Sequence, residues 1–194
     1  MGVLNIICAI VLILASIAVI ALVSMQESKR GMYRPIGINR NNFVAITQLR
    51  PYVPAEMMGV EWIAVGSNAF NEAVPFYANV YATPDYLANT GKDADTNNFY
   101  WANRLAGALA DAHYAACISH VERYQLKLAS EGHRLLKEFD EAYQAKPAED
   151  ATAYLTECNQ KIADTAQALT TDLLNKVLFS ASVEMKNAFA RSDA

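Results

Sequence analysis

The sequence predicts an α+β fold, because short strand candidates come before long helical segments instead of alternating with them. Three segments rich in β-forming residues come first, at about residues 43–50, 60–65 and 75–81. From Thr96 onward, 50 residues run without a proline, and apolar residues recur at helical spacing. Three short strands make a small sheet that needs a partner on one face. The pattern therefore indicates about half of a layered domain.

An apolar segment at residues 1–24 stands in front of this body. As a helix, its central run at residues 3–23 would span a bilayer core of roughly 30 Å. No Lys or Arg precedes residue 29, and the run ends without a favourable cleavage site. These features favour an uncleaved transmembrane helix over a secretory signal.

Basic residues follow the apolar run closely, in and just beyond a linker at residues 25–36. They are Lys29, Arg30, Arg34 and Arg40. Positive charge collects on the cytoplasmic side of membrane helices, so we expect a membrane-anchored protein whose C-terminal body is cytoplasmic. If the run is an artefact of a frameshift or fusion, the whole chain is expected in the cytoplasm.

The three predicted strands open the body, which spans residues 37–194. The first follows a polar turn at residues 39–42, and the second ends in the turn-forming cluster Gly66-Ser67-Asn68. Pro75 belongs at the start of the third strand or on an edge, because it cannot donate to a neighbouring strand.

Two helical regions are predicted after the strands, at about residues 97–143 and 149–190. Thr96 is the expected N-cap of the first region. Gly107 and Gly132 are the expected places for a break or bend that would divide this region into two helices.

Composition and motifs argue against several classes of function. The net charge is −4 and there is no basic stripe, so no nucleic-acid partner is expected. The three cysteines Cys8, Cys117 and Cys158 have no spacing typical of a disulfide framework. The sequence patterns of P-loop, dinucleotide-binding, serine-nucleophile and zinc-protease sites are all absent.

His113, Cys117 and His120 are spaced at i, i+4 and i+7, which puts them on roughly one face of a helix. They could bind a metal ion, or form a pair in which a histidine lowers the pKa of the thiol. No fourth ligand is evident nearby, because Asp111 and Glu122 point elsewhere on the helix. The Ala-rich surroundings favour the alternative, a helix-packing face, so no metal is expected.

Arg50, Ser67 and Asn68 are the candidate polar residues at strand ends. Arg50 could bind a carboxylate through two parallel hydrogen bonds, or it could be a surface residue paired with Glu56 or Glu61. Ser67 and Asn68 lie in a turn after a strand, where Asn68 could serve as an oxyanion donor. An ordinary strand-end turn is the favoured interpretation of this cluster.

Three longer stretches carry a family signal: "RPIGINRNNFVAITQLRPYVP" (34–54), "WIAVGSNAFNEAVPFYANVYATPDYL" (62–87) and "NNFYWANRLAGALADAHY" (97–114). With the ending "MKNAFARSDA" (185–194), they resemble the C-terminal half of the dipeptidase A-type cysteine dipeptidases. The blocks "VPFYANV" and "FYWANR" are the most specific. The resemblance covers about residues 32–194.

The resemblance implies an N-terminal-nucleophile hydrolase with an αββα sandwich fold. Its members cleave dipeptides of broad specificity, mostly in the cytoplasm, and assemble as oligomers. The nucleophile is a cysteine thiolate at the mature N-terminus, and the free α-amine beside it can act as the base. No metal or cofactor is implied.

The chain departs from this pattern at its front. The catalytic cysteine of the family belongs to the half that the resemblance does not cover, and Cys8 lies inside the apolar run. No catalytic residue is therefore assigned, and we expect the isolated chain to be inactive. Arg50, Ser67 and Asn68 lie in matching stretches and are predicted to line the pocket of an intact enzyme.

The sequence suggests two kinds of partner. A partner chain that supplies the missing strands is expected, since half a sandwich leaves apolar sheet surface exposed. The alternative to a hydrolase is a membrane-anchored, non-catalytic helical module that binds a partner such as a full-length paralogue.

Overall fold

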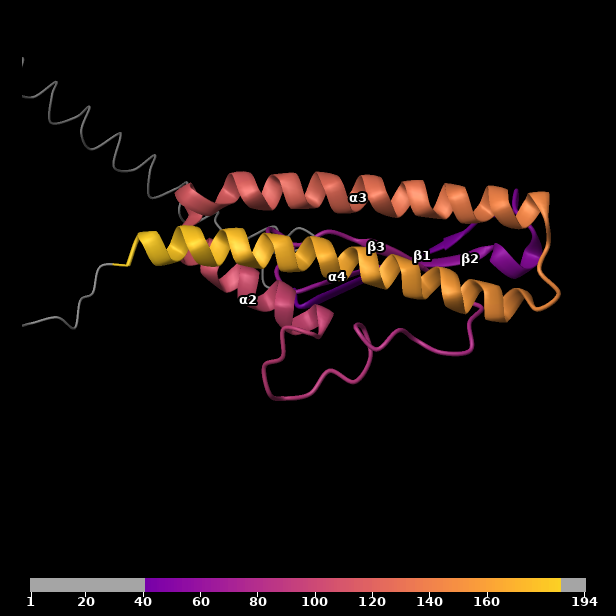
Figure 1. The fold of residues 1–194 in the computed structure, drawn as a ribbon, viewed down its shortest axis with the longest axis horizontal. Helices are drawn as coiled ribbons and strands as arrows, with labels where there is room; N and C mark the ends of the chain where they lie inside the picture. The colour runs from indigo at the N-terminus through magenta and orange to yellow at the C-terminus, as the bar shows by residue number, and fades with distance from the viewer. Residues whose placement is uncertain (1–40, 186–194) are drawn as a thin grey trace, which may run out of the picture. The chain divides into compact units, whose positions relative to one another are not determined.

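The structure is a computed structural model that describes residues 41–185, and Figure 1 shows its elements. They follow the order β1 (Phe43–Leu49), a short 3-10 helix η1 (Ala55–Met57), β2 (Gly59–Val65), β3 (Val74–Tyr77), α2 (Phe99–Ala112), α3 (Tyr114–Ala145) and α4 (Ala151–Val183). A strand block followed by a helix block confirms the predicted α+β class.

The predicted apolar segment 1–24 and the linker 25–36 lie outside the described residues. None of the helices within residues 41–185 combines the length and apolarity that crossing a bilayer requires. The second sheet and second helical layer of an αββα sandwich are not among the described elements.

The sheet is antiparallel with strand order β1-β2-β3. In the register, Phe43 faces Val65 and Leu49 faces Gly59, while Tyr77 of β3 faces Val60. The third strand is shorter than predicted. After Tyr77 the chain turns away, and Ala78 N–H donates to the Gly59 carbonyl at 3.0 Å as the last contact with β2.

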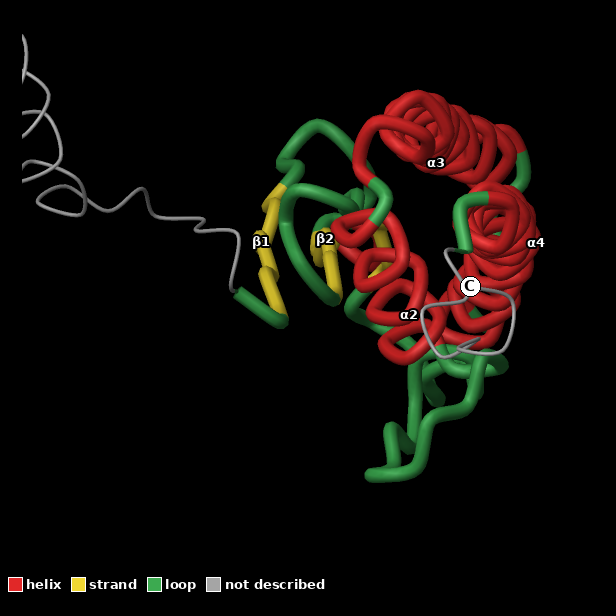
Figure 2. Tube along the Cα trace, turned by 90° about the vertical axis from the view of Figure 1, so that its left-hand side faces the viewer, coloured by secondary structure: helices red, strands yellow, loops and turns green. Residues whose placement is uncertain are grey.

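One edge of the sheet, formed by β3, packs against the helices, and the other edge, formed by β1, lies away from them (Figure 2). All four residues of β3 are buried, β2 is buried or half-buried, and most of β1 is exposed. Figure 2 shows β1 farthest from the helices. Burial therefore falls steadily from β3 to β1.

A buried asparagine of α4 closes the outer edge of β3. Asn159 is 2% exposed, and its side-chain amide pairs with the backbone of Tyr77. Its Oδ1 accepts from Tyr77 N–H at 2.8 Å, and its Nδ2 donates to the Tyr77 carbonyl at 2.9 Å. The amide thus occupies the place of a neighbouring strand.

The predicted helix 97–143 is two helices, and the break is at neither expected glycine. His113 interrupts it, with φ −128° and ψ 45°. Gly132 lies inside α3. A Cβ there would lie 2.8 Å from Pro75 Cδ, so the close approach of β3 requires glycine. Gly107 lies inside α2, where Phe70 packs against it.

Side-chain caps fix the starts of two helices. Asn98, not Thr96, caps α2 by accepting from the Tyr100 N–H at 3.1 Å. Asp150 caps α4 by accepting from the Ala153 N–H at 2.9 Å. The predicted helix 149–190 is thus observed as Ala151–Val183, and residues beyond 185 lie outside the described range.

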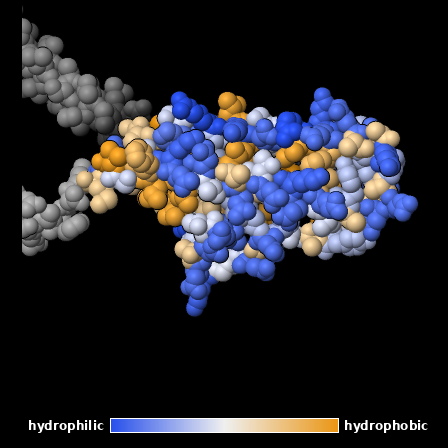
Figure 3. Space-filling model, in the orientation of Figure 1, coloured by the Kyte–Doolittle hydropathy of each residue, from blue (hydrophilic) through white to orange (hydrophobic). Residues whose placement is uncertain are grey.

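The core lies between the three helices and β3. The largest fully buried side chains are Tyr77, Phe99, Met57, Leu128, Leu155, Ile162, Leu173, Val60, Val74, Val121, Val177 and Thr170. Exposed hydrophobic residues gather at the end of the described part where α4 ends, as Figure 3 shows. The large ones on and just after the last turns of α4 are Leu178, Phe179, Val183 and Met185, and the exposed Tyr114 lies at the start of α3.

Candidate functional site

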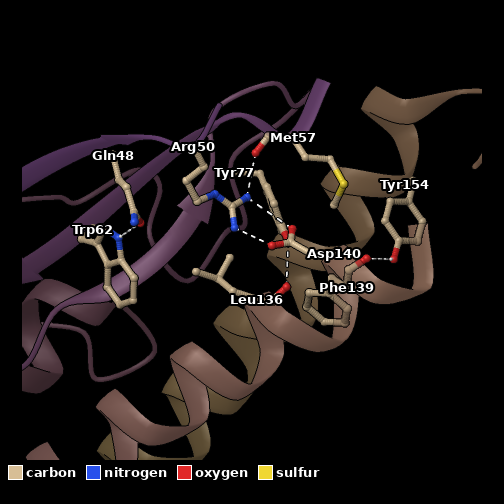
Figure 4. Close-up of polar contacts among 9 residues, drawn as sticks. All are labelled: Gln48, Arg50, Met57, Trp62, Tyr77, Leu136, Phe139, Asp140 and Tyr154. Carbon is tan, nitrogen blue, oxygen red and sulfur yellow. Dashed lines mark hydrogen bonds and ion pairs between the residues drawn. The ribbon is translucent and has the colours of Figure 1, made fainter. Parts of the chain in front are cut away.

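Arg50 follows β1 and points toward α3, where it meets Asp140 (Figure 4). Its Nη1 lies 2.5 Å from Asp140 Oδ2, and its Nη2 donates to Asp140 Oδ1 at 3.3 Å. Nη2 also donates to the Met57 carbonyl at 2.7 Å. The side chains of Arg50 and Asp140 are 4% and 13% exposed, so this ion pair is largely removed from water.

Tyr77 of β3 contacts the same carboxylate, that of Asp140. Its hydroxyl donates to Asp140 Oδ1 at 2.9 Å, and the Arg50 guanidinium lies 5.6 Å from the centre of its ring. Burial raises the pKa of Tyr77, and the negative charge of Asp140 raises it further. Tyr77 therefore stays a neutral donor, and Asp140 links the end of β1 to β3.

The interpretation of Arg50 as a surface residue paired with Glu56 or Glu61 is wrong. Its partner is Asp140, 90 residues away in the sequence. Both terminal nitrogens are occupied within the fold, and Nε is buried with no hydrogen-bond partner among the described residues. That this residue lines the pocket of an intact enzyme stays a prediction.

A cavity of about 320 Å³ opens beside the Arg50–Asp140 pair, between β1 and α3. A second cavity of about 480 Å³ adjoins it and shares Gln48, Trp62 and His133 with it. Trp62 Nε1 donates to Gln48 Oε1 at 2.9 Å, and its ring lies 4.7 Å from that of His133. The two cavities form one groove, here called the β1–α3 groove, along the helix-facing side of the open strand.

Ser67 lies at the other end of the sheet from Arg50. The register pairs the start of β1 with the end of β2, so seven-residue strands separate the two sites by about 20 Å. Ser67 lines a cavity of about 630 Å³ with Arg104, whose Nη1 donates to Asn42 Oδ1 at 2.7 Å. Asn68 follows Ser67 at this same end. The structure thus does not bring the three candidate residues together.

His113, Cys117 and His120 do not converge on one point. His113 caps α2 and its Nδ1 lies 2.8 Å from Glu184 Oε2, while Cys117 is fully buried with its Sγ near the Val177 carbonyl. Among residues 41–185, no group of three or more His, Cys, Asp or Glu side chains could hold a metal ion. The packing interpretation accounts for Cys117.

Both described cysteines are poor nucleophiles. Burial raises the pKa of the Cys158 thiol to about 11, and Cys158 is 1% exposed. Burial also raises the pKa of Cys117, and the charge of Glu184 adds to this. Nucleophilic cysteines need a depressed pKa and access to substrate, and neither thiol has them.

Sequence reasoning missed Asp140, Trp62 and Asn159. Asp140 had a usable signal, because it follows Leu136 by four residues on the buried face of α3. A carboxylate on that face needs a buried cation. Asn159 had a weaker signal of the same kind, between the apolar positions Leu155 and Ile162.

Known proteins place this chain in a peptidase family. The family model of peptidase family C69 matches residues 21–127. "Probable dipeptidase A" of Streptococcus pyogenes serotype M18 is 44% identical over 162 residues, which are 84% of this chain and 34% of that protein. "Dipeptidase" of Bifidobacterium longum is 38% identical, over 87% of this chain and 39% of that protein.

A third relative, "Dipeptidase A" of Lactobacillus helveticus, is 36% identical over 75% of this chain and 31% of its own length. The chain belongs to peptidase family C69 and to its dipeptidase A type. It spans about a third of the length of these curated relatives.

Proposed function

We propose that this chain is one part of a dipeptidase-type peptide hydrolase, and that it acts on dipeptides only together with the part that carries the nucleophile. The observation that carries the proposal is the 44% identity to "Probable dipeptidase A" across 84% of the chain. A match of that extent supports a shared reaction class.

The proposed nucleophile is an N-terminal cysteine outside residues 41–185. Such a thiolate attacks the peptide carbonyl, and the neighbouring α-amine takes its proton. The burial and raised pKa values of Cys117 and Cys158 support this assignment, because neither sulfur can reach a substrate. The described residues would then contribute support for the sheet and part of the pocket wall.

Peptide hydrolysis by the purified 194-residue chain tests the proposal. We expect no release of free amino acids from a panel of unmodified dipeptides. When the chain is co-expressed with the unmatched part of the S. pyogenes relative, we expect turnover to appear. The C117A/C158A double variant is the control and should behave like the parent in both assays. Turnover by the chain alone that this variant loses would contradict the proposal.

A second candidate function is a non-catalytic module that binds a partner such as a full-length paralogue, anchored through residues 3–23 with its body in the cytoplasm. The exposed, apolar strand β1 favours a binding role. Co-purification of a paralogue with the chain from the membrane fraction would support this function. Recovery of the chain only as a soluble monomer would contradict it.

A further inference from the structure

The two outer edges of the sheet are treated differently. At β3, the buried amide of Asn159 satisfies both outward-facing backbone groups of Tyr77. At β1, no described strand or side-chain amide takes that place, and β2 is its only partner strand among residues 41–185. The chain thus closes one edge of its sheet with a dedicated residue and leaves the other edge open within the described residues.

The register identifies the backbone groups on the open edge. Gly66 N–H donates to the Asn42 carbonyl, and Arg50 N–H donates to the Met58 carbonyl, both at 3.0 Å. In an antiparallel pair, hydrogen-bonded positions alternate with positions whose N–H and C=O point the other way. The even-numbered residues of β1 therefore bond to β2. The outward groups belong to Phe43, Ala45, Thr47 and Leu49.

Proteins usually protect an open edge with proline, charge, a bulge or a covering segment. The sequence of β1, FVAITQL, contains no proline and no charged residue, and its pairing with β2 runs without a bulge. Apolar side chains are also exposed on both of its faces. Phe43 and Leu49 are 60% and 71% exposed on one face, and Ile46 is 57% exposed on the other.

The surface beside β1 is hollowed as well. The β1–α3 groove runs along the face that carries Ile46, and its lining includes Trp62 of β2 and Ala129 of α3. A segment that pairs with β1 could continue into this groove and cover Ile46. The edge, the two apolar faces and the groove therefore form one continuous surface.

We propose that the open edge of β1 is the docking surface for a β-strand from the part of the dipeptidase A-type chain that this chain does not match. The proposal rests on the proposed function. About two-thirds of each relative lies outside the matched region, which is enough to supply a strand and cover both faces of β1. A second copy is a weaker occupant, because β1–β1 pairing leaves Phe43, Ile46 and Leu49 uncovered on the faces.

Thr47 allows a selective test, because its N–H points outward. T47P removes that N–H and places the proline ring on the open side, while the bonds of β1 to β2 remain. T47A is the matched control that keeps the N–H. L49K charges one exposed face without changing the backbone. The tagged 194-residue chain is co-expressed with the unmatched part of the S. pyogenes relative, and the amount co-purified is measured.

We expect T47P to reduce co-purification about tenfold or more, L49K to reduce it less, and T47A to leave it within about twofold. Hydrogen exchange in the complex should slow at Ala45 and Thr47, with smaller changes at Ile46. The intact relative should not co-purify with the chain, because its own copy of this region fills the site. Thermal unfolding of T47P alone, at a midpoint close to the parent's, shows that the variant folds.

Three outcomes overturn the inference: equal capture by T47P and the parent, slowed exchange confined to other elements, or a homodimer through β1 in light scattering. These are separate from failure of the proposed function. A complex that protects β1 but hydrolyses no dipeptide contradicts the function alone. Dipeptide turnover that T47P leaves unchanged contradicts the docking surface alone.

Discussion

Asp140 accepts hydrogen bonds from both Arg50 and Tyr77, so one carboxylate joins the end of β1, β3 and α3. Removing one member of a buried ion pair leaves the other charge buried without compensation. We predict that D140N lowers the free energy of unfolding by about 3 kcal/mol, measured by urea denaturation.

The surface pair Lys137–Glu141 is the control for that prediction. These side chains are 77% and 68% exposed, their charged atoms lie 3.8 Å apart, and the two residues are one helical turn from each other on α3. E141Q should change the free energy of unfolding by less than about 0.5 kcal/mol. Equal effects of D140N and E141Q would show that the Arg50–Asp140 pair is not a structural link.

Cys158 and Tyr86 make stability sensitive to alkaline pH. The pKa of Cys158 is raised from 9.0 to about 11, and that of Tyr86 from 10.0 to about 12, each chiefly by burial. The folded state holds these protons more tightly, so their contribution is complete below pH 9 and is lost as pH rises toward 11 and 12.

We therefore predict a nearly constant free energy of unfolding from pH 7 to 8.5 and a loss of about 3 to 4 kcal/mol by pH 11. In C158A the loss by pH 11 should be smaller than in the parent, because only Cys117 and the buried tyrosines such as Tyr86 then hold protons more tightly in the folded state. Urea denaturation at a series of pH values measures both curves. Identical curves for the parent and C158A would contradict the role of Cys158.

The Arg50–Asp140 contact shows why the candidate site could not be foreseen in full. Sequence spacing identified Arg50 as a polar strand-end residue, but its partner lies 90 residues away. Helical spacing marks Asp140 as a carboxylate on the buried face of α3, but it does not identify Arg50 as the residue that Asp140 meets. Only the packing of α3 on the sheet decides that choice.

At the scale of elements, Asn159 is the residue through which α4 completes the outer edge of β3. We predict that N159A lowers the free energy of unfolding by about 1 to 3 kcal/mol, because Tyr77 N–H and C=O lose their partners in the core. N175A, an exposed asparagine on the same helix, should change it by less than about 0.5 kcal/mol. Chemical denaturation compares the two variants, and equal effects would mean that the Tyr77 backbone finds other partners.

Two helical glycines should respond to alanine in opposite directions. A Cβ at Gly107 meets Phe70 at an ordinary 3.6 Å, so G107A should gain up to about 1 kcal/mol from helix propensity. A Cβ at Gly132 would lie 2.8 Å from the rigid ring of Pro75, so G132A should lose about 1 to 3 kcal/mol. Thermal unfolding of both variants measures the difference, and stabilisation by G132A would contradict the close approach.

These glycines also show the limits of predicting elements from sequence. The helical regions and three strands follow from apolar spacing and β-forming residues, which are local properties. The expected breaks at Gly107 and Gly132 are wrong, because tertiary packing holds both residues in helices. The break at His113 has no glycine or proline to mark it.

At the scale of the whole molecule, stability should fall from the helical core toward β1. The side chains of β3 are buried throughout, whereas β1 is exposed on both faces. Local opening costs less where few apolar contacts are lost. We predict that the β2-bonded amides of Val44, Ile46 and Gln48 exchange at a lower opening free energy than the amides of Leu155 and Ile162.

Hydrogen exchange of the intact chain, followed by NMR, measures this gradient. The internal control is α3, whose buried residues such as Leu128 should exchange only through global unfolding. Uniform protection of β1 and α4 would mean that the edge strand is covered in the isolated chain.

Some features of the whole fold could be predicted from the sequence, and others could not. Element order predicted the α+β class, and three short strands correctly indicated a sheet too small to close on itself. Which strand would be left outside could not be predicted, because both β1 and β3 are apolar. The contact of Asn159 with Tyr77 determines that β3 is the covered strand, and the two residues lie 82 positions apart in the sequence.

Because Asn159 occupies the β3 edge, the sheet can be extended in one direction only. A fibre built by strand addition needs two free edges on every subunit, since each copy must receive one neighbour and offer itself to the next. Within the described residues this sheet has one. Adding a copy through β1 gives a closed pair with no end left to grow, so a misassembled form built on this sheet stops at two chains.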